Sequence, residues 1–173
     1  MRIKSCLLKK IVDWDILPCS IRWKKSVSDV GRMYADIMNM MQAHYGAEGV
    51  KKLSEVMYTI GLGQADEISE LLGLEKTLEG CAYALLAMHR IFGIKSRIAQ
   101  KDDNKIVIHV THCCWGRSKK GWTAHTCASI AHYETGLVKG ILPSATHSYI
   151  KRYTLGDEIC ELIIAVKEEE TYV

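Results

Sequence analysis

In the first half of the chain, apolar residues recur every three or four positions, which is the spacing of amphipathic helices. This pattern predicts a helix over 26–45, opened by a serine cap and closed by Gly46. A second helix is expected over 49–73, and a third, capped by Thr77, over 78–92. The first of these carries its expected core-facing stripe at Val30, Met33, Tyr34, Ile37 and Met41.

After the third helix the apolar period changes from near 3.6 to 2, which indicates β-strands. One strand is expected over 94–99 and a return strand over 106–114, with the polar turn 102–104 between them. Successive side chains of a strand point to opposite faces. The alternation therefore places His112 and Cys114 on the more apolar, inward face of the return strand, with Ile106, Ile108 and Val110.

The last third of the chain predicts one more helix and a second pair of strands. The helix starts at Thr123 or Thr126 and runs to Lys139, and the strands cover 145–154 and 158–168. The simplest arrangement that buries every apolar stripe is an α+β fold, with helices packed on one face of a four-stranded antiparallel sheet.

Length and composition fit this picture. A chain of 173 residues, 48% apolar and 25% charged, is typical of one globular domain. We expect an N-terminal arm over 1–24 and a single α+β ligand-binding domain over 25–173. The apolar residues of the arm need cover, so a homodimer is expected.

Charge and hydropathy limit the classes of partner. The net charge of +3 is too small to predict nucleic-acid binding, and the basic cluster of Arg117, Lys119 and Lys120 is interpreted as a solvated loop. No apolar run reaches the roughly 18 residues of a membrane span. Seven cysteines without a recognisable export signal favour reduced thiols, so a cytoplasmic location is expected.

Candidate chemistry concentrates between Thr111 and Glu134, a stretch that holds three cysteines, three histidines and two tryptophans. Thiolate and imidazole are ligands for soft metals, and zinc is the expected ion. No CxxC pair occurs, so the spacing matches neither a zinc ribbon nor a ferredoxin, and an iron–sulfur cluster is less favoured. The expected metal ligands are Cys113, Cys114, Cys127 and Cys160, and the expected small-molecule contacts are Trp115, Trp122, His125 and His132.

A nucleophilic mechanism competes with the metal. Cys127 lies near a helix N-terminus, where the helix dipole favours the thiolate and lowers the thiol pKa. His112 would act as its base, and Glu134, on the same helix face as Cys127, would orient that base or relay a proton. A carboxylate on the buried side of a helix is costly unless it is paired. Glu134 is therefore the most informative residue of the set.

Several of these residues also carry a family resemblance. Cys114-Trp115, the lone Cys127 that opens a helix, the Ile141-Leu142-Pro143 sequence and the final GDEICELII strand resemble the 4-vinyl reductase-type small-molecule-binding domain. The same features resemble the group named for L-2-amino-thiazoline-4-carboxylate hydrolase. The similarity covers roughly 80–168, and its most specific part is the Gly156-Asp157…Cys160-Glu161 motif.

The resemblance implies a fold similar to the small subunits of the TRAPP vesicle-tethering complex, often dimeric. It also implies a cysteine-lined pocket for a metal or a small, partly apolar molecule. Cys127 and Cys160 match the family cysteines, and the third position falls on Cys113 or Cys114.

Two functions follow as hypotheses. One is a hydrolase that cleaves a C–N bond of a small heterocycle, using either zinc-activated water or Cys127. The other is a non-catalytic sensor or assembly module that holds a hydrocarbon-like or tetrapyrrole-like ligand.

Overall fold

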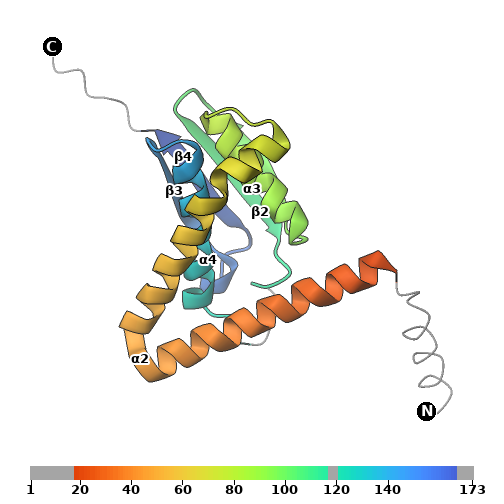
Figure 1. Ribbon diagram of the computed structural model, residues 1–173, viewed down its shortest axis with the longest axis vertical. Helices are drawn as coiled ribbons and strands as arrows, with labels where there is room; N and C mark the ends of the chain where they lie inside the picture. The colour runs from red at the N-terminus through yellow and green to blue at the C-terminus, as the bar shows by residue number, and fades with distance from the viewer. Residues whose placement is uncertain (1–17, 117–120, 167–173) are drawn as a thin grey trace.

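The computed structural model describes residues 18–116 and 121–166. Within these ranges three α-helices pack on one face of a four-stranded antiparallel sheet, so the predicted α+β class is confirmed (Figure 1). The elements follow one another as α2 (Cys19–Leu72), α3 (Leu78–Ile91), β1 (Lys95–Lys101), β2 (Lys105–His112), α4 (Ala124–Ile141), β3 (Ala145–Lys151), the 3-10 turn η1 (Tyr153–Leu155) and β4 (Cys160–Val166). Most of the predicted arm and the basic loop residues lie outside the described ranges.

The first two predicted helices form one long, bent helix, α2. Its backbone leaves helical geometry at Gly46, with φ 59° and ψ −146°, so the predicted break is present as a kink. A positive φ of this size suits glycine, which has no Cβ. The helix begins earlier than predicted, at Cys19, with Pro18 as its N-cap. Figure 1 shows the two halves of α2 diverging at this bend.

Helices α3 and α4 begin at the predicted caps. The Thr77 hydroxyl accepts a hydrogen bond from the Gly80 amide, and Thr123 forms a reciprocal capping box with Thr126. The second half of α2 crosses α4 at very close range. A Cβ on Gly61 would lie 2.0 Å from the Tyr133 carbonyl oxygen, so only glycine fits at this crossing.

The buried face of α2 differs from the expected stripe. Small residues and one methionine are buried along its first half, at Gly31, Ala35 and Met38, whereas Met33 and Ile37 are 59% and 40% exposed. The reason is close packing: Gly31 lies against the indole of Trp115, where a larger side chain would collide. The bulky residues of the predicted stripe are left outside this contact.

The sheet has the strand order β1-β2-β4-β3. Its inward face carries Ile106, Ile108 and Val110 of β2 and Leu162 and Ile164 of β4, all buried against the helices. The β1–β2 register contains an irregularity at its end: Ser96 pairs with Val110, but Lys95 pairs with His112. Thr111 is therefore an extra residue, and a bulge of this kind reverses which side chains face inward beyond it.

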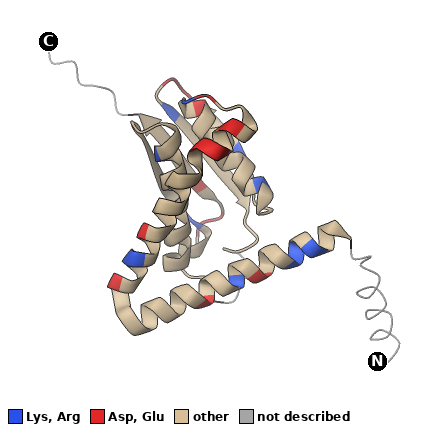
Figure 2. Ribbon diagram, in the orientation of Figure 1, with Lys and Arg blue, Asp and Glu red and all other residues tan. Residues whose placement is uncertain are grey.

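Charged residues of both signs are interspersed along α2 (Figure 2). Among the described helices, none combines the length and the apolar character needed to cross a bilayer.

Candidate functional site

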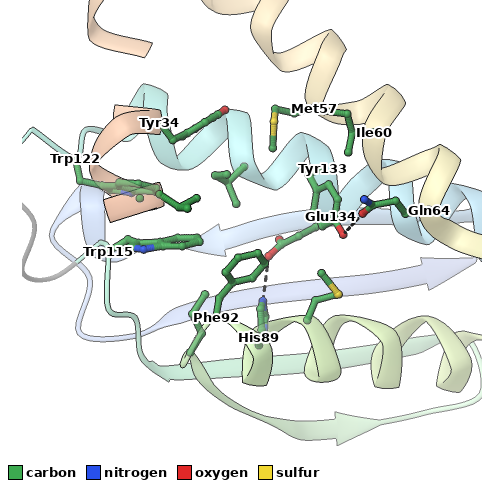
Figure 3. Close-up of a pocket in the computed structure, with 15 residues that line it drawn as sticks. Tyr34, Met57, Ile60, Gln64, His89, Phe92, Trp115, Trp122, Tyr133 and Glu134 are labelled. Carbon is green, nitrogen blue, oxygen red and sulfur yellow. Dashed lines mark hydrogen bonds and ion pairs between the residues drawn. The ribbon is translucent and has the colours of Figure 1, made fainter. Parts of the chain in front are cut away.

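A cavity of about 320 Å³ lies between the two halves of α2, α3, α4 and the loop after β2 (Figure 3). We call it the main cavity. Its walls are aromatic and aliphatic apart from the polar side chains of Gln64, His89 and Glu134 and the hydroxyls of Tyr34 and Tyr133. The lining residues are Val30, Gly31, Tyr34, Met57, Ile60, Gln64, Met88, His89, Phe92, Ile94, Trp115, Trp122, Ile130, Tyr133 and Glu134. Its size falls at the lower end of the range for small-molecule sites.

Four aromatic rings form one wall. The Trp115 and Trp122 rings stack with centroids 5.2 Å apart, Phe92 lies 5.1 Å from Trp115, and Tyr34 lies 6.2 Å from Trp122. The Trp115 indole N–H donates to the Val27 carbonyl at 3.2 Å, which fixes the loop against α2. Both predicted ligand-contact tryptophans therefore line the cavity.

Glu134 closes the opposite side of the main cavity and is only 6% exposed. His89 Nε2 on α3 donates to Glu134 Oε1 at 3.0 Å, and His147 Nε2 on β3 lies 3.4 Å from Oε2. Burial alone would raise the pKa of this carboxyl. The two histidines beside it, His147 and His89, outweigh that effect and hold the pKa well below its ordinary value. The carboxylate is therefore ionised.

A smaller chamber of about 40 Å³ continues from the main cavity, with which it shares walls that include His89, Trp115 and Glu134. We call it the thiol chamber, because Cys113, Cys127 and Cys160 line it. Burial raises the pKa of all three thiols, that of Cys160 to about 12. For Cys127 this direction is opposite to the lowered pKa expected from the sequence, and its largest cause is burial.

Cys114 and His112 face away from the thiol chamber. Both line a second cavity, of about 340 Å³, beside Trp23 and Lys24 at the start of α2. The Cys114 thiol donates to the Phe92 carbonyl at 3.2 Å. The bulge at Thr111 explains this, because it reverses the alternation that predicted Cys114 inward and leaves Cys113 in that position.

The remaining predicted residues are not brought together. His125 and His132 are exposed on α4 and line neither the main cavity nor the thiol chamber. His112 does not share a cavity with Cys127 or Glu134, so the proposed base is not placed beside the proposed nucleophile.

Three of the four expected zinc ligands, Cys113, Cys127 and Cys160, line the thiol chamber. Across residues 18–116 and 121–166, no group of three or more His, Cys, Asp or Glu side chains is arranged to hold a metal ion. The zinc site stays a prediction without structural support, and the iron–sulfur cluster likewise.

Three residues of the Glu134 cluster were not predicted from the sequence: His89, His147 and Tyr149. His89 is buried, with its Nδ1 2.8 Å from the Ser96 hydroxyl. The pKa of the Tyr149 phenol is raised by burial and by the charge of Glu134, so this hydroxyl keeps its proton. A buried carboxylate needs hydrogen-bonding or charged partners, and this requirement of Glu134 was the one signal in the sequence that pointed to these residues.

Comparison with known proteins gives matches by structure alone. No family model matches the chain, and no curated protein matches it. Solved structures do match. One is a trafficking protein particle complex subunit 3 from Naegleria fowleri, covalently bound to palmitic acid, with a TM-score of 0.64 and 19% identity over 84% of this chain and 97% of that one.

Another match is the phenol-responsive sensory domain of the transcription activator PoxR, solved with phenol. It has a TM-score of 0.59 and 13% identity, over 83% of this chain and 76% of that one. At these identities the similarity establishes the fold, and the TRAPP-subunit-like architecture expected from the sequence is confirmed.

Proposed function

We propose that this protein is a ligand-binding module that holds a small, flat, partly apolar molecule in the main cavity. The observation that carries the proposal is the shape and chemistry of that cavity. A wall of four packed aromatic rings faces a single buried carboxylate across about 320 Å³. Mostly apolar pockets with a few placed polar groups are the usual form of small-molecule sites.

The two structural neighbours support this proposal and suggest two kinds of ligand. One neighbour is a sensory domain solved with phenol and the other holds palmitic acid covalently. Flat rings gain offset-stacked or edge contacts with tryptophan that a flexible chain does not. The ionised Glu134 would also repel the carboxylate of a free fatty acid. Both features favour an aromatic ligand.

The hydrolase hypothesis has less support from the same geometry. Direct attack by Cys127 requires a thiolate, and burial raises the pKa of this thiol. His112, its predicted base, lines a different cavity. The sensor or assembly hypothesis needs neither group, and we adopt it in its ligand-binding form.

Calorimetric titration with phenol, and separately with palmitate, tests the proposal. We expect phenol to bind, and Trp122→Leu to weaken it about threefold to tenfold, since one aromatic pair contributes about 0.5–1.5 kcal/mol. Tyr83→Leu is the control, because Tyr83 is exposed on α3 and does not line the main cavity. Absence of phenol binding, or equal weakening by both variants, would contradict the proposal.

Self-association remains a prediction, and the structure offers a surface for it. Apolar residues exposed on the first half of α2 recur every seven positions, at Trp23, Val30 and Ile37. Met33 and Met40, also exposed, each follow one of them by three positions. We propose that a second copy of the chain covers this stripe. Sedimentation should show a dimer that Ile37→Glu converts to a monomer, and a monomeric wild type at micromolar concentration would refute it.

A further inference from the structure

We infer that the main cavity selects ligands that carry an O–H or N–H donor, and that Glu134 is the residue that accepts it. This inference rests on the proposed function and names the ligand chemistry of the same site. A phenol or an aromatic amine has this chemistry. An aryl ether or an aromatic carboxylate does not.

The first support is the hydrogen bonding of the two carboxylate oxygens. Oε1 accepts from His89 Nε2 at 3.0 Å. Oε2 is buried and makes no hydrogen bond of ordinary geometry among the described residues; the atom that faces it, His147 Nε2 at 3.4 Å, likewise has no hydrogen-bond partner there. Leaving a buried acceptor unsatisfied is costly, and buried polar groups in proteins are nearly always paired. A donor on a bound ligand would supply the missing hydrogen bond.

The second support is the position of Glu134. It lines the main cavity (Figure 3) and also the thiol chamber, which shares walls with it. Its place is fixed from two other elements, by His89 on α3 and His147 on β3. A ligand ring against Trp115 and Trp122 would therefore meet a carboxylate that is already held in place.

The third support is that three donors of the cavity wall are already used. The Tyr34 hydroxyl donates to Ser129 at 2.6 Å and the Tyr133 hydroxyl donates to Gln64 at 2.9 Å. The Trp115 N–H donates to Val27. A ligand acceptor finds none of these three donors available, whereas a ligand donor finds Glu134. A ligand carboxylate would in addition meet a like charge, which is a strong means of exclusion in a buried site.

A set of four benzene derivatives tests the inference on the wild-type protein: phenol, aniline, anisole and benzoate. We expect phenol and aniline to bind at least about tenfold more tightly than anisole, since a hydrogen bond to a charged group contributes about 1.5–3 kcal/mol. Benzoate should bind no better than anisole. If anisole binds as well as phenol, the inference fails while the proposed function stands. If no compound binds, the proposed function fails as well.

Glu134→Gln sharpens the test, because it removes the charge and keeps an acceptor of similar shape. Charge-assisted hydrogen bonds are roughly twice as strong as neutral ones, so the preference for phenol over anisole should fall about threefold or more. Glu161→Gln is the control: this glutamate is also paired with a histidine, His109 at 2.7 Å, but lines neither of the two cavities. An unchanged preference in a folded Glu134→Gln protein would overturn the inference. If that variant does not fold, the wild-type series decides.

Discussion

Two histidine–glutamate pairs lie on opposite sides of the sheet, and they differ in their surroundings. Between the covering helices, the side chains of His89 on α3 and Glu134 on α4 are 4% and 8% exposed. On the other face, His109 and Glu161 are 26% and 14% exposed, and Lys151 approaches the same carboxylate at 3.4 Å. The residues are alike, but the covered pair lines the main cavity and the thiol chamber, whereas His109 and Glu161 line neither. The comparison shows that burial and a neighbouring cavity, rather than residue type, make a pair a candidate site.

The largest expected difference between the faces is in stability. Glu134→Leu leaves two buried histidines without their carboxylate, and breaking a buried pair costs about 3–5 kcal/mol. Glu161→Leu removes a partly solvated pair and should cost about 1 kcal/mol or less. Urea unfolding of both variants measures the difference. Equal losses would show that the covered cluster has no special role in the fold.

The next effect concerns the helix layer that covers the site. Gly61→Ala places a Cβ against the Tyr133 backbone, one residue from Glu134, and should destabilise the protein by about 1–3 kcal/mol. Gly63→Ala, on the same helix with open space at its Cβ, should be neutral or stabilising by roughly 0.5–1 kcal/mol. Thermal unfolding of the two variants checks this. A tolerated Gly61→Ala would contradict the close crossing of α2 and α4.

A pH titration of stability probes Glu134 directly. Its pKa is lowered in the folded state, so the unfolded chain binds more protons below the ordinary glutamate value of about 4.3. The stabilisation is therefore present above that pH and is lost as the pH falls through the folded pKa. The difference in unfolding free energy between the wild type and Glu134→Gln should shrink from about pH 5 to pH 2. A difference that stays constant over this range would mean that folding does not lower the pKa of Glu134.

The smallest effect is chemical rather than energetic. Burial raises the pKa of Cys113, Cys127 and Cys160, so these thiols should resist iodoacetamide in the native protein. Cys19, which is exposed at the start of α2, is the internal control and should react. Peptide mass spectrometry gives the extent of alkylation at each site. Reaction of Cys127 as fast as Cys19 would revive the nucleophile hypothesis.

The layered fold was predictable because its signals are local. The change of period after the third helix marks the strands, Thr77 and Thr123 cap helices, and Gly46 marks the bend in α2. Which face of α2 is buried was not predictable, because the close approach of Gly31 to Trp115 depends on tertiary packing.

The candidate site was predictable only in part. Glu134 stood out because a carboxylate on a buried helix face requires partners. Those partners, His89 and His147, come from other elements and share no sequence motif with it. The one-residue bulge at Thr111 reversed the expected roles of Cys113 and Cys114, and no residue type in the strand signals it.

The most direct test of the central claim, that the main cavity is a binding site for a small aromatic molecule, is a crystal structure of the protein grown with phenol. We predict the ring against Trp115 and Trp122, with its oxygen at a hydrogen-bonding distance of about 2.6–3.0 Å from the Glu134 carboxylate. Phenol bound only outside this cavity, or a cavity filled by the protein's own side chains, would contradict the claim.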